Sequence, residues 1–269
     1  MKVLVTGASG TLGQPLVRAL VSRGHSVRAL SRRERPSLGG IEWARGDLRS
    51  GDGIAQSVAG VDAVVHAATL GGSSDGKTRL RYMFKHPSHT DVGGTQRLAD
   101  ASREAGVAHF VYTSIVGVDR VPLGYWKNKV HAEAIVTGAG VPYTLARATQ
   151  FYELIDAAVR YALRFPVAMM PRDQRVQPID PGDAAALIAK LVDVPPANGI
   201  VNYGGPDEMT MGEAADAWLV HRGVSKRIRR MPLPGRIGKA LAGGALCTDD
   251  HSGTITWKQW LDTHPKEES

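Results

Sequence analysis

Short apolar runs recur along the first 150 or so residues and alternate with stretches that have helical spacing. Each run is brief and rich in valine, leucine or alanine, as in strands that are buried on both faces. In the intervening stretches apolar side chains return every three or four residues, as at Leu12, Leu16 and Leu20, and a later stretch ends at Gly106. The pattern predicts strands at residues 2–6, 26–31, 63–67, 109–114 and 144–146, with helices between them.

This alternation predicts an α/β protein built on a doubly wound parallel sheet. Parallel strands need crossover connections, which are right-handed and usually helical, so that helices cover both faces of the sheet. After about residue 150 the rhythm breaks into pieces punctuated by proline, as at Phe165-Pro166 and Pro195-Pro196. We therefore expect a core at residues 1–150 and a smaller, substrate-covering region at residues 151–269, which packs on the core and partly continues it.

Two helix starts and one loop are legible in the less regular parts. Asp180 and Pro181 form a cap followed by a first-turn proline, and Thr210 and Glu213 form a capping box. Residues 71–90 are polar, basic and aperiodic, which predicts a mobile loop beside the ligand cleft.

The first thirteen residues combine a strand, a glycine-rich turn and a helix start with no spacer. Gly7 permits a tight turn, Gly10 allows the backbone to approach a pyrophosphate, and Gly13 allows the helix to pack closely on the strand. The free N–H groups and the positive dipole at the helix start favour an anion, so we expect a Rossmann-type dinucleotide site, the alternative being an ordinary tight turn. The residues assigned to the site are Thr6, Gly7, Ser9, Gly10, Thr11, Leu12 and Gly13.

The end of the second strand indicates which dinucleotide is bound. An NAD-selective site has an acid there for the ribose hydroxyls, whereas this chain has Ser31, Arg32 and Arg33. An arginine fork suits a 2′-phosphate, so the sequence favours NADP(H) over NAD(H), the alternative being a solvated arginine pair. Asp47 and Leu48 are expected at the adenine, with a plain helix cap at Asp47 as the alternative.

Composition and charge narrow the class of protein further. The formal net charge is +7, but the basic residues are scattered, which fits a phosphate-bearing small molecule and argues against nucleic acid as the partner. The single cysteine, Cys247, fits a reducing compartment. No secretory signal and no membrane-length apolar run are present. These features predict a cytoplasmic protein with a small-molecule substrate and no membrane partner. A homodimer is a possible assembly, because dimers are the commonest oligomers of such proteins.

With these residues in view, the chain resembles the short-chain dehydrogenase/reductase superfamily, in its extended and atypical branches of NAD(P)-binding epimerase-like and NmrA-like proteins. The resemblance spans nearly the whole chain. It implies a nucleotide that runs from the glycine turn across Ala67, Ala68 and Thr69, with its nicotinamide near Thr149, Gln150 and Phe151. The motifs that carry it lie at residues 6–13, 47–48, 66–69, 91–95, 112–114, 125–129 and 147–151.

The resemblance also implies a catalytic set of Tyr125, Lys129 and Ser114. Residues four apart share one face of a helix, so the Lys129 ammonium can lie beside the Tyr125 phenol and lower its pKa. Tyr125 is then the proton donor, Lys129 also holds the nicotinamide ribose, and Ser114 binds the substrate oxygen. The alternative for Lys129 is a surface pair with Glu133.

Further side chains along the chain are of types that can carry chemistry. His86 and His89 flank a proline without cysteine or acidic partners, so no metal site is expected. An apolar substrate pocket and plain core packing both remain open for five side chains, Trp126, Tyr152, Phe165, Met169 and Met170.

Three functions follow from the motifs. The first is an NADP(H)-dependent oxidoreductase that transfers hydride to a carbonyl or conjugated double bond of a small organic molecule. The second is an NmrA-type regulatory protein that binds NADP(H) to sense redox state without catalysis. The third is an epimerase or dehydratase that recycles its own nicotinamide.

Overall fold

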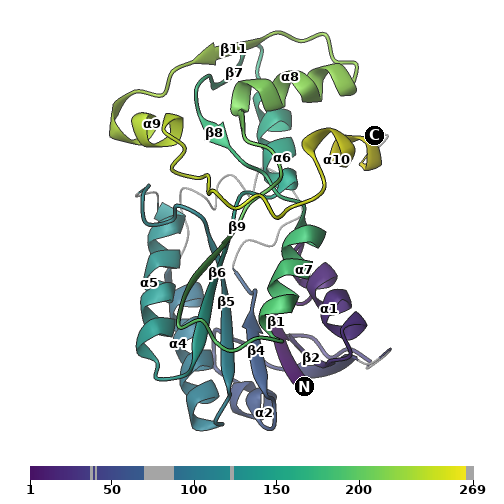
Figure 1. Ribbon diagram of the computed structural model, residues 1–269, viewed down its shortest axis with the longest axis vertical. Helices are drawn as coiled ribbons and strands as arrows, with labels where there is room; N and C mark the ends of the chain where they lie inside the picture. Colours follow the sequence, from purple (N-terminus) through teal and green to yellow (C-terminus); the bar gives the residue numbers. More distant parts are fainter. Residues whose placement is uncertain (37–38, 40, 70–87, 122–123, 265–269) are drawn as a thin grey trace.

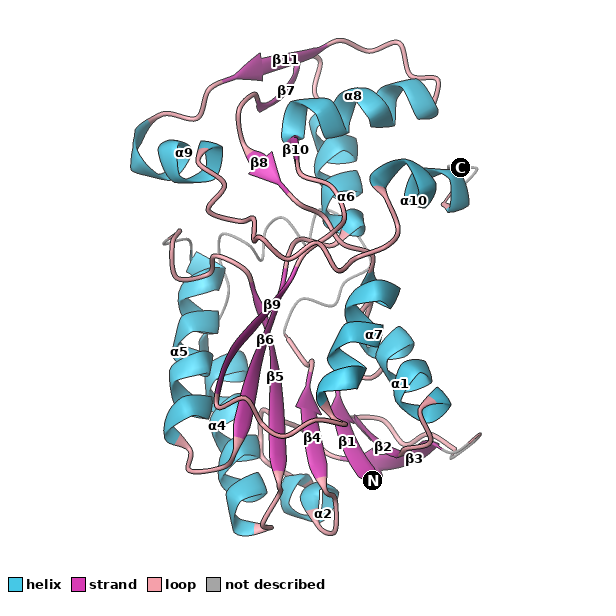
Figure 2. Cartoon of the chain, viewed as in Figure 1, coloured by secondary structure: helices cyan, strands magenta, loops and turns pink. Residues whose placement is uncertain are grey.

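The computed structural model describes residues 1–36, 39, 41–69, 88–121 and 124–264, without the side chains of residues 88–90, 124 and 125. Seven parallel strands form the central sheet in the order β3-β2-β1-β4-β5-β6-β9 (Figures 1 and 2). The strand order reverses between β1 and β4, the place where doubly wound sheets bind their ligands. The strands are β1 Lys2–Thr6, β2 Ser26–Ser31, β3 Ile41–Arg45, β4 Ala63–His66, β5 His109–Ile115, β6 Tyr143–Ala148 and β9 Gly199–Tyr203. The predicted Rossmann-type fold is confirmed.

Helices cover both faces of this sheet. On one side α1 (Gly13–Ser22) packs against α7 (Pro181–Leu191), and on the other α4 (Ser88–Glu104) packs against α2 (Ile54–Val58) and α5 (Gly124–Gly138). Successive β1 residues alternate between the two cores, with Val3 and Val5 in one and Leu4 in the other. This alternation is the period-two geometry of a strand buried on both faces.

The rest of the C-terminal part lies above the carboxyl ends of the strands (Figure 1). Its own core is built around Tyr152, Trp218, Trp257 and Trp260. The helices are α6 Tyr152–Ala162, α8 Met211–His221, α9 Gly235–Ala242 and α10 Trp257–Thr263, and two small sheets pair β8 (Arg175–Val176) with β10 (Met209–Thr210) and β7 (Ala168–Pro171) with β11 (Ile228–Met231). The division at residue 150 stays a prediction, and β9 and α7 come from beyond it yet belong to the layers of the main sheet.

Both predicted helix caps are confirmed. The Asp180 carboxylate accepts the N–H groups of Gly182 and Asp183 at 2.7 and 3.2 Å, and Thr210 and Glu213 form a reciprocal capping box. Of the predicted loop, residues 71–87 lie outside the described part of the chain, and residues 88–90 form the first turn of α4. Among the described helices, none combines the length and the apolar composition that a bilayer crossing requires.

Candidate functional site

The glycine turn joins β1 to α1 at the switch point of the sheet. Gly7 has a φ of +69°, and a Cβ on it would lie 2.7 Å from the Ala67 carbonyl oxygen. A Cβ on Gly13 would lie 2.0 Å from the Gly7 carbonyl oxygen, so the close packing of helix on strand requires glycine there. The turn residues Ser9 and Gly10 are exposed, Thr11 is half-buried and Leu12 is buried.

The start of α1 suits an anion. No side chain caps it, and its first turn holds no acidic residue, so the positive end of the helix dipole is not neutralised by the chain itself. The structure thus provides an open turn at the point where a pyrophosphate is expected.

A buried histidine links the glycine turn to α4 through hydrogen bonds. His66, at the end of β4, is 2% exposed; its Nδ1 lies 2.6 Å from Thr6 Oγ1 and its Nε2 lies 3.0 Å from Thr95 Oγ1. The Thr95 hydroxyl donates to the Asp91 carbonyl at 2.6 Å, and the Ala68 N–H donates to Thr6 Oγ1 at 3.1 Å. The network is satisfied when His66 is neutral, with Nε2 donating and Nδ1 accepting.

Burial of histidines makes stability depend on pH. Desolvation, aided by the charge of Lys129, lowers the pKa of His66 to about 3, and desolvation lowers the pKa of His109 to about 4, from an ordinary 6.5. The unfolded chain takes up these protons near pH 6.5 and the folded chain does not. The contribution to stability is therefore complete above that pH and is lost as the pH falls towards the folded values.

For each of the two histidines, we expect the free energy of unfolding to fall by up to about 1.4 kcal/mol for each pH unit of acidification. Urea unfolding between about pH 7 and about pH 5.5 measures this slope. His109→Gln should reduce it, while His131→Gln, at an exposed position on α5, serves as the matched control. An unchanged slope in His109→Gln would contradict the assignment.

Arginines gather at the ends of β2 and β3. Arg32 and Arg33 follow β2 and are exposed, and Arg35 lies 4.8 Å from the ring centre of Trp43 on β3. A hollow of about 200 Å³ is lined by Arg33, Glu34, Arg35, Trp43, Ala44 and Arg45. Ser31 is half-buried and its Oγ accepts the Arg33 N–H at 3.2 Å. The site therefore offers basic groups where the adenosine phosphate of NADP(H) is expected.

Asp47 and Leu48 have local structural contacts. Asp47 Oδ1 accepts the N–H of Arg49 at 2.8 Å, which forms a turn, and no helix begins at Asp47, since α2 starts at Ile54. Leu48 is half-buried against the core and lies close to Gly94 of α4. The helix-cap alternative is wrong, and the adenine contact stays a prediction.

Lys129 is buried at the carboxyl edge of the sheet. It is 5% exposed, its Nζ donates to the Thr113 carbonyl at 3.0 Å, and it lies 4.7 Å from the ring centre of Tyr112. Burial lowers the pKa of Lys129, and the carboxylates of Asp91 and Glu133 partly oppose this shift. The surface-pair alternative is wrong, because Lys129 faces the strand ends.

The partner of Glu133 is a different residue, Arg147 of β6. Arg147 Nε and Nη2 donate to the two oxygens of Glu133 at 2.9 and 2.6 Å, and both side chains are buried. A third group, the half-exposed carboxylate of Asp119, accepts from Arg147 Nη1 at 3.2 Å. This bidentate pair holds α5, and with it Lys129, against the sheet.

Ser114 and Tyr125 complete the predicted catalytic set. Ser114 follows Thr113 on β5, and its hydroxyl is buried without a hydrogen-bond partner in the described part of the chain. A buried hydroxyl of this kind is costly unless a ligand satisfies it. Tyr125 lies in the first turn of α5, one turn before Lys129, but its side chain is outside the described residues.

The segment expected near the nicotinamide connects the core to the C-terminal part. The Thr149 hydroxyl accepts the Gly205 N–H at 3.3 Å, and Gln150 Nε2 donates to the Leu246 carbonyl at 3.0 Å. Phe151 is half-buried, forms a β-bridge with Ile179 and precedes α6.

The segment after β4 lies beside the glycine turn. Ala67 and Ala68 are half-buried there, and Thr69 Oγ1 donates to the Asp91 carboxylate at 3.1 Å. Their contacts with a nucleotide stay predictions.

The five side chains named as candidates for a substrate pocket do not lie together. Tyr152 and Met170 belong to the C-terminal core, and Trp126 belongs to another cluster, which also includes Leu241 of α9. Phe165 and Met169 are about half exposed. Core packing is therefore the correct interpretation for three of them.

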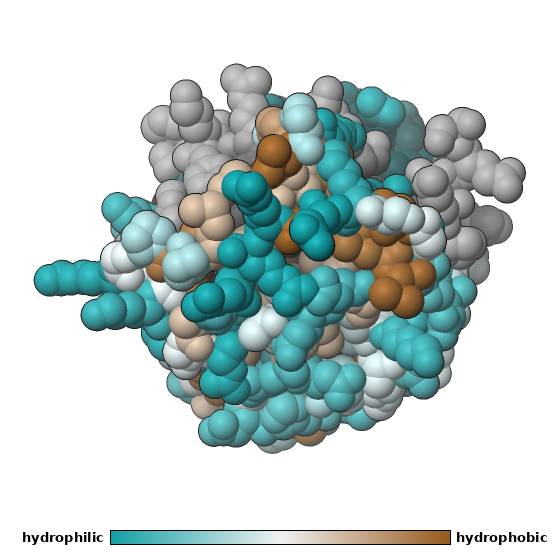
Figure 3. Space-filling view, turned by 90° about the horizontal axis from the view of Figure 1, so that it is seen from above, coloured by the Kyte–Doolittle hydropathy of each residue, from teal (hydrophilic) through white to brown (hydrophobic). Residues whose placement is uncertain are grey.

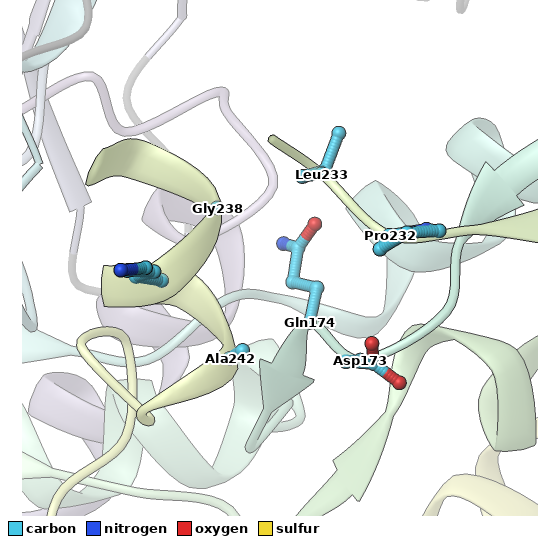
Figure 4. A pocket seen from close by; sticks show the side chains of 7 residues that line it. Asp173, Gln174, Pro232, Leu233, Gly238 and Ala242 are labelled. Atoms are coloured by element: carbon cyan, nitrogen blue, oxygen red, sulfur yellow. The ribbon is translucent and has the colours of Figure 1, made fainter. Parts of the chain in front are cut away.

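Two other features lie apart from the glycine turn. A hollow of about 190 Å³ in the C-terminal part is lined by residues that include Asp173, Leu233 and Lys239, and Figure 4 shows the Gln174 amide reaching between α9 and Leu233. The described residues hold no group of three or more potential metal ligands. His86, and the side chain of His89, lie outside the described part.

The fold and the turn define a dinucleotide-binding Rossmann protein, and comparison with known proteins specifies the family. A family model described as NAD(P)H-binding matches residues 7–195. The chain therefore belongs to the NAD(P)H-binding family, which confirms both the predicted resemblance and the nicotinamide dinucleotide as the class of cofactor.

Three relatives illustrate the similarity. The 2-alkyl-3-oxoalkanoate reductase of Stenotrophomonas maltophilia is 38% identical over 160 residues, which cover 52% of this chain and 46% of that protein. An NADPH-dependent quinone oxidoreductase of Escherichia coli, solved with NADPH, superposes with a TM-score of 0.78 at 18% identity over 97% of this chain and 99% of that chain. A short-chain dehydrogenase/reductase superfamily protein of Agrobacterium tumefaciens, solved with NAD, gives 0.72 at 22% identity over 98% and 95%. The chain spans less than half the length of the curated relatives it matches.

Sequence reasoning missed two parts of the site. The Thr113 carbonyl holds Lys129, and His66 joins three secondary-structure elements. A histidine at the end of an apolar run was the available signal for the second, whereas its threonine partners come from other elements. A backbone carbonyl leaves no signal in the sequence.

Proposed function

We propose that this protein is an NADPH-dependent reductase that transfers a hydride to a carbonyl or conjugated double bond of a small organic molecule. The observation that carries the proposal lies at the carboxyl edge of the sheet, where a buried lysine is bound to the residue before Ser114, whose buried hydroxyl has no hydrogen-bond partner among the described residues. Lys129 Nζ is bound to the carbonyl of Thr113, the residue before Ser114. The reductase name of a relative 38% identical over half of this chain supports the same class of reaction.

The residues present fit the dinucleotide. Gly7 and Gly13 allow the tight turn and the close packing of α1, since a Cβ at either would collide with backbone atoms, and the uncapped start of α1 faces the expected pyrophosphate. Arg32 and Arg33 bind the 2′-phosphate in this proposal, and Lys129 binds the nicotinamide ribose. When bound, the reduced nicotinamide supplies the hydride.

The chain's own groups handle the proton and the substrate oxygen. Ser114 donates a hydrogen bond to the carbonyl oxygen of the substrate, which polarises the carbon that receives the hydride. Tyr125 gives its phenolic proton to that oxygen, so the ketone becomes an alcohol, the cofactor is left oxidised, and solvent returns a proton to the phenolate. Lys129 stabilises the phenolate because a nearby positive charge lowers a phenol pKa.

The test is a turnover assay with purified protein, NADPH and a panel of quinones, ketones and conjugated enones. We expect loss of reduced-nicotinamide absorbance together with a stoichiometric reduced product. Binding of the reduced and oxidised cofactor with different affinities, without turnover on any member of the panel, would instead assign the protein to redox sensing. Tightly held NAD that is never released would indicate an epimerase or dehydratase.

Cofactor selectivity gives a second prediction. We expect Arg32→Ala and Arg33→Ala together to weaken NADPH binding by about tenfold or more and to leave NADH binding nearly unchanged, because only NADPH carries the 2′-phosphate. Calorimetric titration with each cofactor measures both affinities. Arg49→Ala is the matched control, since Arg49 is exposed on the turn beyond β3. Equal losses for the two cofactors would contradict the role of the pair.

A further inference from the structure

Exposed apolar side chains concentrate at one end of the C-terminal part. Ten large hydrophobic residues of the described chain are exposed, and six of them come from two short segments, residues 164–172 and 226–239. The six are Phe165, Val167, Met169, Met231, Leu233 and Ile237, each between 37% and 52% exposed. Single exposed apolar residues are ordinary, but a gathering of this kind indicates a contact surface.

The register of the small sheet places part of this set on one face. β7 and β11 pair in parallel, with Met169 opposite Arg229 and Met231 opposite Pro171. Side chains alternate along a strand, so Met169, Arg229 and Met231 share the outer face, while Ala168 and Met170 are buried on the inner face. Figure 3, which views the molecule from this end, shows hydrophobic surface interleaved with hydrophilic surface. We call residues 164–172 and 226–239 the β7–β11 face.

The charge of this face is strongly one-sided. Residues 226–239 contain six lysines and arginines and no aspartate or glutamate. Arg230 is neutralised by Asp216 on the inner side, whereas Arg227, Arg229 and Arg236 are exposed and form no ion pair within the described residues. The outer face therefore combines exposed apolar side chains with uncompensated positive charge.

The face continues into α9 towards the candidate active site. Arg236, Ile237 and Lys239 are exposed on α9, while Leu241 of the same helix packs in a cluster with Trp126. Trp126 lies in the first turn of α5, next to Tyr125 and one turn before Lys129. One side of α9 thus belongs to the exposed face, and Leu241 on the other side shares a hydrophobic cluster with Trp126 of the helix that carries the proposed catalytic residues.

We propose that the β7–β11 face docks this protein on an anionic membrane surface. Basic residues interspersed with exposed methionine, leucine, isoleucine and phenylalanine match the interfacial zone of a bilayer, where apolar groups insert and cations meet lipid phosphates. A second copy on the same face would bring like charges together, and nucleic acid would leave the apolar side chains in water. The expectation of no membrane partner rested on the absence of a spanning segment, which surface docking does not need.

Vesicle sedimentation tests the proposal without reference to catalysis. We expect the full chain to sediment with vesicles of phosphatidylcholine mixed with phosphatidylglycerol, to remain in solution with phosphatidylcholine alone, and to bind less at high salt. Arg227→Glu with Arg229→Glu should weaken binding by about tenfold or more. Met169→Ser with Met231→Ser should weaken it while the salt dependence remains.

Matched controls lie on other exposed surfaces. Arg18→Glu with Lys190→Glu and, separately, Val220→Ser should bind vesicles as the unmodified chain does, because Arg18, Lys190 and Val220 are exposed on α1, α7 and α8. Thermal melts and NADPH titration verify that each variant is folded. No binding to the anionic vesicles, or equal losses in the controls, overturns the proposal. So does a homodimer that the methionine variants dissociate, or retention of nucleic acid in place of vesicles.

Discussion

Lys129→Met is expected to reduce kcat/KM for NADPH-dependent turnover by about 10²- to 10⁴-fold while the protein stays folded. Methionine approximates the length of lysine without its charge. The variant therefore loses the ammonium that the proposal assigns to the nicotinamide ribose and to the Tyr125 phenolate.

If Lys129 served only to stabilise the fold, Lys129→Met would lower the free energy of unfolding. We expect the opposite. The burial of its ammonium costs free energy that a single carbonyl hydrogen bond and the nearby carboxylates only partly offset. An apolar replacement should therefore leave the free energy of unfolding unchanged or increase it, even as turnover is lost. Urea unfolding and steady-state kinetics on the same preparation separate the two roles.

The controls for this prediction lie on the same helix. Lys127→Met removes an exposed lysine two residues away and should change kcat/KM by less than about twofold. Tyr125→Phe should keep NADPH affinity while it lowers kcat, because the phenol hydroxyl is assigned to proton transfer alone. Turnover of Lys129→Met near that of the unmodified chain would remove Lys129 from the mechanism.

The sequence predicted the part of the fold that is buried on both faces. Strands β1 and β2 have the predicted bounds, β4 and β5 differ at one end by one residue, and β6 begins one residue earlier and ends two residues later, because continuous apolar runs mark such strands clearly. The edge strand β9 was missed because only Tyr203 of its five residues is buried. β7 and β11 were missed because each is four residues long and is stabilised by pairing with a distant segment.

The candidate site was predictable where backbone geometry dictates the residue type. Gly7 and Gly13 stand where no Cβ fits, and local spacing is enough to identify them. The environment of Lys129 was not predictable in the same way. Helical spacing proposed Glu133 as its neighbour, but Arg147, from a strand 14 residues farther along the chain, binds Glu133 instead. Only the packing of α5 on β5 and β6 decides which partner each charge takes.

That pairing carries the largest stability effect we expect. Arg147→Met should lower the free energy of unfolding by about 3–5 kcal/mol, because it leaves the carboxylate of Glu133 buried without its bidentate partner. Asp119 is half exposed and should add little to this effect. Urea unfolding at neutral pH measures the change.

Two variants make the measurement specific. Arg103→Met removes an arginine whose 3.7 Å pair with Asp100 is exposed, and it should cost less than about 1 kcal/mol. Arg147→Met combined with Glu133→Leu should recover most of the lost stability, because no unpaired charge is then buried. If the single and double variants are equally unstable, the cost lies in packing rather than in the unpaired carboxylate. If instead the double variant recovers stability but turnover stays low, the ion pair serves mainly to orient α5. That orientation places Lys129 beside Thr113 and Ser114 of β5.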